Sequence, residues 1–299
     1  MDRLTSMAVF VKAVDLGSFA AAAAALDLSG PMVGKHVRFL EERMGVRLLN
    51  RTTRRQSLTE FGRAYYDRCR LVLAEADAAE ALAADQLTRP CGRLRVAMPV
   101  LFGRHCVSPV LLELARQHSG LELDLSLNDR LVDLAEGGFD LAIRTGDLAD
   151  SAGLIARRVA RQRMIVCASP AYLSEFGEPR QIDDLKGHQA IVYRRSGRIP
   201  PWRFPGIDGA SSEILPANRL RMDDLAAIAD AAAAGLGLAW LPSWLVHGQI
   251  QSGSLVWILR DEAQHLYDVH ALWPQTPYMP MRTRLAIDAL AADLPGLMV

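Results

Sequence analysis

The chain reads Ser18-Phe-Ala-Ala-Ala-Ala-Ala-Ala-Leu-Asp-Leu-Ser-Gly-Pro-Met-Val-Gly-Lys-His-Val-Arg-Phe-Leu40, and this stretch decides how the first sixty residues fold. Gly17 ends a first helix predicted over about residues 4–14, and Ser18 is a good N-cap for the helix that follows. The second helix is rich in alanine, which lets a neighbouring helix approach closely. Asp27-Leu28 then forms a tight turn. The pattern predicts two short helices joined at a corner.

A third helix is predicted from Ser29 to Leu40. Ser29 can cap it, and Pro31 lies in its first turn, where a missing N–H costs nothing. Val33, Val37 and Leu40 have the spacing of a buried stripe. The polar and flexible side chains between them are expected to point outward: Met32, Lys35, His36 and Arg38. This arrangement is typical of a helix-turn-helix that reads duplex DNA, although exposed cations can also simply solvate a helix face.

The next residues predict a β-hairpin wing. Leu48-Leu49 and Ser57-Leu58 have the pattern of two short strands, so the winged helix-turn-helix is the expected fold of this region. From Lys35 to Arg55 there are seven Lys or Arg against two Glu, a net charge of 7 − 2 = +5. Such density suits phosphate contacts and a wing that enters a minor groove. The expected DNA-contacting residues are Ser18, Ser29, Pro31, Met32, Lys35, His36, Arg38, Arg51, Thr52, Thr53, Arg54 and Arg55.

Composition agrees with a modular protein. The whole chain balances 34 basic against 34 acidic residues, so the excess of positive charge is confined to the N-terminal module. A length of 299 residues suggests two or three domains. No apolar run approaches the roughly 20 residues that span a bilayer, and no signal-peptide pattern begins the chain, so no membrane role and a cytoplasmic location are expected.

Four cysteines are scattered along the chain without the spacing of a metal site. They are interpreted as buried small hydrophobes, with a redox sensor as the alternative. The histidines are dispersed as well, and neither a metal nor a cofactor is expected.

One long helix joins the N-terminal module to the rest of the chain. Thr59 can cap it, and Pro90 and Gly92 stop it. Its apolar residues follow steps of three and four, while its other positions are charged. A narrow stripe of this kind favours dimerisation, with packing on its own domain as the alternative. The expected dimer contacts are Phe61, Tyr65, Cys69, Val72, Ala76, Ala79 and Ala83.

The remaining two thirds alternates between predicted strands and helices. Strands are expected at 93–98, 121–127, 139–144, 164–168, 190–193 and 236–241, with helices at about 107–117, 131–136 and 225–234. A turn is expected at 99–103. This alternation predicts a mostly parallel sheet with covered faces.

The chain resembles the LysR-type transcriptional regulators. The N-terminal resemblance rests on Phe10-Val-Lys-Ala-Val14, Gly17-Ser-Phe-Ala20, Leu48-Leu-Asn-Arg-Thr52 and Leu58-Thr-Glu-Phe-Gly62, in order and at the family's spacing. The family usually has Gln at the position of Gly30 and Ser or Thr at that of Gly34. The two glycines remove side chains that could contact DNA. They leave more of the readout to the neighbouring residues, or let the backbone approach the DNA more closely.

The resemblance continues in the second part, through Glu136-Gly-Gly-Phe-Asp-Leu-Ala-Ile-Arg144, Cys167-Ala-Ser-Pro-Ala-Tyr-Leu173 and Ala234-Gly-Leu-Gly-Leu-Ala-Trp-Leu-Pro242. It implies an effector domain of two α/β subdomains of the periplasmic-binding-protein type. The implied boundaries are a DNA-binding domain at 1–60, a linker and dimerisation helix at 61–90, and an effector domain at 91–299. Within it, subdomain I would hold 91–161 and 267–299, and subdomain II 162–266.

The cleft between the subdomains is the expected ligand site, because ligands bind beyond the carboxyl ends of strands. In this family it commonly takes small organic acids or aromatic metabolites. Arg144 could pair with a carboxylate, or instead form a salt bridge to Asp140 or Asp147. Val100 and Leu101 stand where many relatives carry a hydroxyl residue, which argues against a polar clamp and leaves two alternatives, a more apolar ligand or none. The expected lining is Pro99, Val100, Leu101, Phe102, Asn128, Arg144, Thr145, Ala168, Ser169, Trp202 and Asp223.

These features together predict a sequence-specific transcriptional regulator. Its partners would be double-stranded promoter DNA, a small-molecule effector and further copies of itself, as dimers and as tetramers or larger assemblies, with RNA polymerase as a further candidate. An enzyme is not expected, because nucleophile, phosphate-loop and metal motifs are absent from the sequence. A solute-binding transport protein would leave the basic module unexplained. A ligand-independent DNA-binding repressor with a vestigial cleft stays as the alternative.

Overall fold

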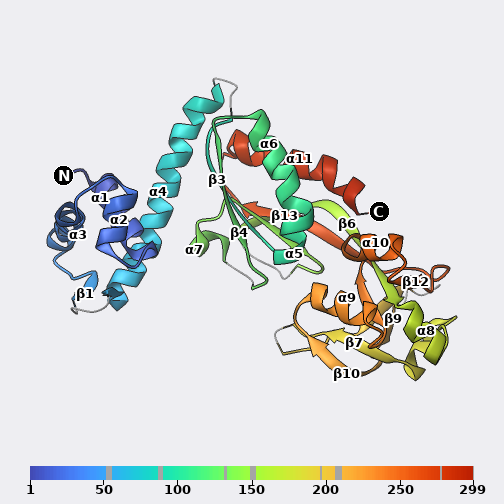
Figure 1. Cartoon of the computed structure of the whole chain (residues 1–299). Helices are drawn as coiled ribbons and strands as arrows, with labels where there is room; N and C mark the ends of the chain where they lie inside the picture. The colour runs from blue at the N-terminus through green and yellow to red at the C-terminus, as the bar shows by residue number, and fades with distance from the viewer. Residues whose placement is uncertain are drawn as a thin grey trace.

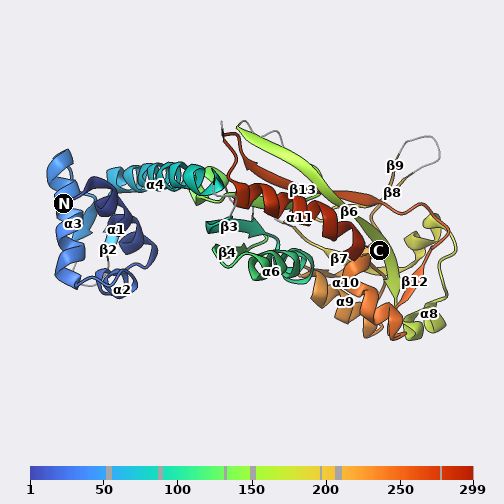
Figure 2. The same ribbon diagram turned by 90° about the horizontal axis from the view of Figure 1, so that it is seen from above.

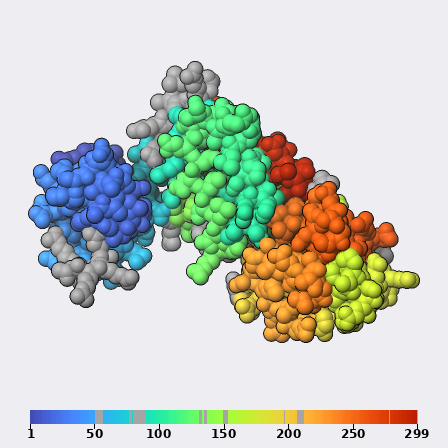
Figure 3. Space-filling model, viewed as in Figure 1, coloured from blue at the N-terminus to red at the C-terminus, as the bar shows by residue number. Residues whose placement is uncertain are grey.

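A computed structural model describes residues 1–51, 56–86, 90–130, 133–148, 153–195, 197–205, 211–276 and 278–298. The N-terminal helical unit lies at one end, the long helix α4 leads away from it, and a two-part α/β region follows (Figure 1). The space-filling view places the N-terminal unit and the second α/β subdomain at opposite ends of the molecule, with the first subdomain between them (Figure 3).

The N-terminal unit is the predicted helix-turn-helix. Its helices are α1 (Arg3–Asp15), α2 (Phe19–Ala25) and α3 (Gly30–Met44). The Ser18 Oγ accepts a hydrogen bond from the Ala21 N–H at 3.4 Å, which confirms the predicted cap of α2. Ser29 holds the N-cap position of α3 without a side-chain capping bond. Asp27 turns the chain with φ of 53°, in the left-handed region.

A buried carboxylate joins the end of α3 to the wing. The wing strands are β1 (Leu49–Arg51) and β2 (Gln56–Leu58), antiparallel, with Leu49 opposite Leu58. Glu41 of α3 is 9% exposed, and its Oε1 accepts hydrogen bonds from the N–H groups of Leu48 at 2.9 Å and Leu49 at 3.4 Å. These bonds satisfy the backbone as it enters β1.

The long helix α4 (Glu60–Gln86) begins where the sequence predicts. The Thr59 Oγ1 accepts a hydrogen bond from the Gly62 N–H at 2.8 Å, which caps its first turn. Its first half packs on its own domain, because Cys69 is 1% exposed in the core with Phe10, and the ring centroid of Tyr65 lies 5.9 Å from that of Phe10. The prediction that Cys69 is a dimer contact is therefore wrong, and Tyr65 is half-buried against the same domain.

The first α/β subdomain is built on three parallel strands, with β3 between β5 and β4. The predicted turn at 99–103 is wrong, because a helical segment starts immediately after β3. Gly103 permits this close start, since a Cβ there would lie 2.4 Å from the Met98 Cγ. The elements are β3 (Gly92–Met98), α5 (Val100–Phe102), a π-helical turn (Gly103–Val107), α6 (Ser108–Gln117), β4 (Leu121–Leu127), α7 (Leu134–Gly137), β5 (Leu141–Thr145) and α11 (Met281–Leu297).

Two antiparallel strands connect the subdomains. The strands β6 (Leu154–Ala168) and β13 (Leu266–Pro274) pair from Leu154 opposite Pro274 to Arg163 opposite Leu266, with a bulge between Val269 and His270. Beyond that point β6 pairs with β11 and β12 of the second subdomain, also antiparallel. Because β13 and β5 pair antiparallel too, the sheet is mixed, and the prediction of a mostly parallel sheet is wrong.

The second subdomain has a core on each side of β6. Figure 2 shows β6 running from the first subdomain into the second, with α9 and α10 near the junction. Its elements are α8 (Pro170–Phe176), a 3-10 turn (Ile182–Gly187), β7 (Gln189–Tyr193), β8 (Trp202–Pro205), β9 (Ser211–Ile214), β10 (Ala217–Met222), α9 (Leu225–Ala233), β11 (Ala239–Pro242), α10 (Ser243–Gln251) and β12 (Val256–Ile258).

Three of the four cysteines are buried: Cys69, Cys106 and Cys167. Burial raises the pKa of Cys69 to about 11 and the pKa values of Cys106 and Cys167 to about 12. These thiols stay protonated at neutral pH, as expected for small hydrophobic residues rather than redox sensors. Within the described part of the chain, no helix has the length and apolar character needed to cross a bilayer.

Removing the Glu41 carboxylate should loosen the wing. Glu41→Ala leaves two buried N–H groups without their acceptor, at a cost of about 1–3 kcal/mol in the free energy of opening. Hydrogen exchange should rise at the Leu48 and Leu49 amides. Glu42→Ala is the matched control, since Glu42 is exposed on the same turn. Equal exchange in the two variants would contradict the assigned bond.

Candidate DNA interface and ligand cleft

The outer face of α3 carries the predicted contact residues. Pro31, Met32, Lys35 and Arg38 are exposed, and Met32 is 38% exposed. The opposite face, with Val33, is buried against α1 and α2, so the outer face is held rigidly by the packing behind it. Two cations one turn apart on a well-fixed helix can contact phosphates on one strand of a duplex.

His36 does not belong to that face. It is 6% exposed, and its Nδ1 lies 3.0 Å from the Ser6 Oγ of α1. Burial lowers the pKa of His36, and the positive charges of the N-terminal amine and Lys35 lower it further. The prediction that His36 points outward is therefore wrong, because positions 33, 36, 37 and 40 all fall on the buried stripe of a helix.

Gly30 and Gly34 leave the start of α3 open to a close approach. Neither residue has the positive φ that would require glycine. A Cβ at Gly30 would have no protein atom within 4 Å, and a Cβ at Gly34 would meet only Phe19 Cε2, at 3.9 Å. Nothing inside the protein therefore demands these glycines, while glycine in a helix costs up to about 1 kcal/mol relative to alanine.

The remaining predicted contacts lie at the edges of this surface. Ser29 is exposed, and Ser18 is partly buried as the cap of α2. Arg51 is the last residue of β1. The predicted wing tip, Thr52, Thr53, Arg54 and Arg55, lies outside the described residues.

A cavity of about 630 Å³ lies between the two α/β subdomains. Its walls come from the carboxyl ends of β3, β4 and β5, from the crossing strands, and from β7, β8 and the start of α9. The structure brings most of the predicted lining residues together there: Pro99, Leu101, Phe102, Asn128, Arg144, Thr145, Trp202 and Asp223.

Three predicted residues lie outside the cavity lining. Val100 is the first residue of α5, it is 36% exposed, and it is not among the residues that line the cavity. Ala168 is fully buried at the end of β6. Ser169 is 2% exposed and caps α8, where its Oγ accepts a hydrogen bond from the Tyr172 N–H at 3.1 Å. The predictions for Val100, Ala168 and Ser169 are wrong.

Aromatic side chains form one wall of this cavity, and that wall was not predicted from the sequence. The ring centroid of Trp240 on β11 lies 6.3 Å from that of Trp202 and 6.0 Å from that of Tyr267. Trp244 donates its Nε1–H to the Gln162 Oε1 at 3.0 Å. Trp240 is 8% exposed, and its Nε1–H is buried and has no hydrogen-bond partner among the described residues. An aromatic wall suits a flat ligand.

Four arginines also line the cavity: Arg144, Arg195, Arg198 and Arg203. Arg203 forms ion pairs with Glu213 at 3.0 Å and Asp147 at 3.4 Å. Burial lowers the pKa of the half-buried Arg144, and the nearby charge of Arg195 lowers it further. Of the two carboxylates considered as partners of Arg144, Asp140 accepts a hydrogen bond from the Arg95 N–H at 2.8 Å, and Asp147 pairs with Arg203.

Two neighbouring cations in a partly buried cleft favour an anion, because an anion relieves their mutual repulsion. The cavity also holds acidic residues, but Asp129 accepts the Val100 N–H and Asp224 accepts the Ala227 N–H at 2.7 Å. Among the described residues, no group of three or more His, Cys, Asp or Glu is placed to hold a metal ion. The aromatic wall and the neighbouring cations suit an aromatic anion.

Comparison with known proteins covers both parts of the chain. Residues 4–63 match the bacterial regulatory helix-turn-helix proteins of the LysR family, and residues 88–295 match the LysR substrate binding domain. The chain is 34% identical over 289 residues to an HTH-type transcriptional repressor of Pseudomonas aeruginosa, covering 96% of this chain and 91% of that one. It is 34% identical over 293 residues to the transcriptional activator AaeR of Escherichia coli, covering 97% and 93%. The solved structure of CrgA, a LysR-type regulator from Neisseria meningitidis, matches with a TM-score of 0.60 and 30% identity, covering 97% of this chain and 98% of that one.

The buried His36 should make the N-terminal unit sensitive to acid. Because its folded pKa lies below the ordinary value of 6.5, the unfolded chain binds more protons as the pH falls through that value. Stability should therefore decline from pH 7.5 to pH 5.5. His36→Asn removes this titration and should flatten the slope of unfolding free energy against pH. The exposed His247→Asn is the control, and an unchanged slope in His36→Asn would refute the assignment.

Proposed function

Because the chain belongs to the LysR family of DNA-binding transcriptional regulators, we propose that it binds promoter DNA as a homodimer and that an aromatic carboxylate in its cleft controls this binding. The observation that carries the effector assignment is the aromatic wall of Trp202, Trp240 and Tyr267, which lines the same cavity as the neighbouring cations Arg144 and Arg195. The family relatives are transcriptional regulators rather than enzymes.

The outer face of α3 is the proposed DNA contact. Lys35 and Arg38 would bind phosphates, and Pro31 and Met32 would lie along the groove. The open backbone at Gly30 and Gly34 supports a close approach of the helix start to base edges. The predicted wing adds Arg51 as part of a second set of contacts. The other members of that set, Thr52–Arg55, lie outside the described residues.

The proposed dimer forms through the exposed side of α4. Phe61 is 44% exposed and Val72 is 41% exposed, although the same helix buries Cys69 in its own domain. Ala79 is also exposed and Ala76 is partly buried, while Ala83 lies further along α4. Exposed large apolar side chains on a long helix are stabilised by a second copy of that helix. Paired units would then engage two half-sites, and larger assemblies would pair dimers.

The proposed effector places its ring against the aromatic wall and its carboxylate near Arg144 and Arg195. The strands β6 and β13 connect the two subdomains. A ligand that contacts both subdomains would therefore change the angle between the subdomains. Such a change alters transcription only if the ligand prefers one arrangement.

Removing the two cations of α3 should weaken DNA binding without abolishing the fold. In Lys35→Gln with Arg38→Gln, affinity for the chain's own promoter and for unrelated duplexes should fall together. The slope of log affinity against log salt should fall by about 2, since each lost phosphate contact contributes about 0.9. Arg104→Gln with Lys186→Gln is the matched control, because both residues are exposed cations far from α3. If the salt slope of DNA affinity is the same in the Lys35→Gln with Arg38→Gln variant as in the control variant, the outer face of α3 is not the DNA contact.

Benzoate is the probe for the cleft, with the neutral isostere benzamide as its control. Benzoate should quench the tryptophan fluorescence of the intact protein, while benzamide binds more weakly. Arg144→Gln should weaken benzoate binding about tenfold or more, because a hydrogen bond to a charged group contributes roughly 1.5–3 kcal/mol. Operator affinity without ligand should stay as in the wild type. Operator binding that no aromatic acid changes would favour the ligand-independent repressor.

A further inference from the structure

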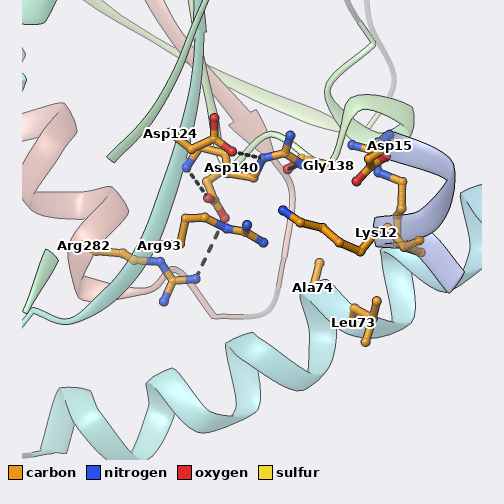
Figure 4. Close-up of a pocket in the computed structure, with 12 residues that line it drawn as sticks. Lys12, Asp15, Leu73, Ala74, Arg93, Asp124, Gly138, Asp140 and Arg282 are labelled. Carbon is orange, nitrogen blue, oxygen red and sulfur yellow. Dashed lines mark hydrogen bonds and ion pairs between the residues drawn. The ribbon is translucent and has the colours of Figure 1, made fainter. Parts of the chain in front are cut away.

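A second cavity, of about 190 Å³, lies where the DNA-binding helices meet the regulatory region. Its walls come from α1 and α4 on one side and from β3, β4, the residues before β5 and the start of α11 on the other. No residue of α3 lines it. Figure 4 shows the side chain of Lys12, from α1, extending over α4 toward Arg93 and Asp140.

Positive charge exceeds negative charge in this cavity. Its lining holds one lysine and four arginines against three aspartates, a net charge of 5 − 3 = +2. The aspartates already have partners. Asp124 pairs with the Arg95 Nε at 2.9 Å, Asp140 accepts the Arg95 N–H at 2.8 Å, and Asp15 accepts a hydrogen bond from the Tyr66 hydroxyl.

One cation is buried with a donor that has no partner. The side chain of Arg282 is 8% exposed, and its Nη2 lies 3.9 Å from the Asp140 Oδ1, a long ion pair. Its Nε–H is buried and makes no hydrogen bond within the part of the chain that the structure describes. A buried donor without a partner costs free energy, so such groups are usually satisfied by a ligand or water. Together with the excess charge, this donor indicates an anion.

We propose that this cavity binds a small oxyanion of charge −2, either a phosphoryl group or a short dicarboxylate, between the DNA-binding helices and the regulatory region. The charge matches the excess of two cations. The volume is below the roughly 300–1,000 Å³ typical of sites for drug-sized ligands, which excludes nucleotides and other large molecules.

The site lies across the junction of the two regions, and this position determines its effect. Lys12 belongs to α1, whereas Arg93 and Arg282 belong to the regulatory region. An anion held by all three holds α1 and α4 against β3 and α11. Because it binds only when both parts are in place, it stabilises this arrangement by mass action. The proposal is independent of the cleft between the α/β subdomains.

The test measures anion binding to the intact protein at pH 7.5 and constant ionic strength. Equilibrium dialysis with radiolabelled inorganic phosphate should give about one bound anion per chain, and phosphate should raise the Tm above its value in chloride. Succinate tests the dicarboxylate source in the same way. Nitrate, a monoanion, should give no increase in Tm. Binding of phosphate alone, succinate alone or both identifies the source.

Lys12→Gln with Arg93→Gln should weaken this binding at least tenfold. Neither residue is fully buried, so the double variant should still fold, as its circular dichroism would show. Arg104→Gln with Lys186→Gln is the matched control. Arg38→Gln and Arg144→Gln test the DNA-contacting face and the cleft, and both should retain wild-type binding. The proposal is overturned if neither dianion binds, if the Lys12 and Arg93 double variant binds as the wild type does, or if Arg38→Gln or Arg144→Gln abolishes binding.

Discussion

The antiparallel pairing of β6 with β13 is the constraint on which the regulatory region depends. These strands hold the first subdomain together along their paired length, and β6 alone then continues into the second subdomain between β11 and β12. Both cores of the second subdomain are therefore built on a strand that starts in the first. The bulge between Val269 and His270 interrupts the ladder before the crossing, where an extra residue bends a strand.

The cleft follows from that constraint. Because β11 pairs with β6 just beyond the crossing, Trp240 lies at the junction of the subdomains, where it meets Tyr267 of β13. The arginines come from different elements, Arg144 from β5 and Arg203 from β8, so any movement between the subdomains changes their spacing. The cleft is thus an aromatic wall with movable charges around it.

Local signals predicted the N-terminal unit well. Caps at Ser18 and Thr59, together with the apolar spacing of α3, depend on neighbours a few residues away. His36 was predicted to be exposed because it is polar, although it falls on the buried stripe of α3. Only its hydrogen-bond partner, Ser6, explains why a polar side chain is buried there. That partner is thirty residues away in the chain.

The regulatory region was harder to predict, since its form depends on which strands pair. The first half of β6 carries exposed arginines such as Arg157 and Arg161, which hide its strand character. Trp240 lies in a strand whose residues are all buried, so its pattern is that of core and gives no sign of a ligand site. Val100, Ala168 and Ser169 were assigned by position after a strand, whereas the direction of a side chain there depends on how the next helix starts.

The packing of Tyr65 and Cys69 into the core beneath α3 makes α4 a stiff arm of the DNA-binding unit. A helix of 27 residues is about 40 Å long at 1.5 Å per residue. Tilting such an arm by about 5° at its far end displaces the other end by about 3.5 Å, close to the 3.4 Å rise between successive nucleotides. A tilt of a few degrees is thus enough to shift the DNA-reading surface by one base-pair step.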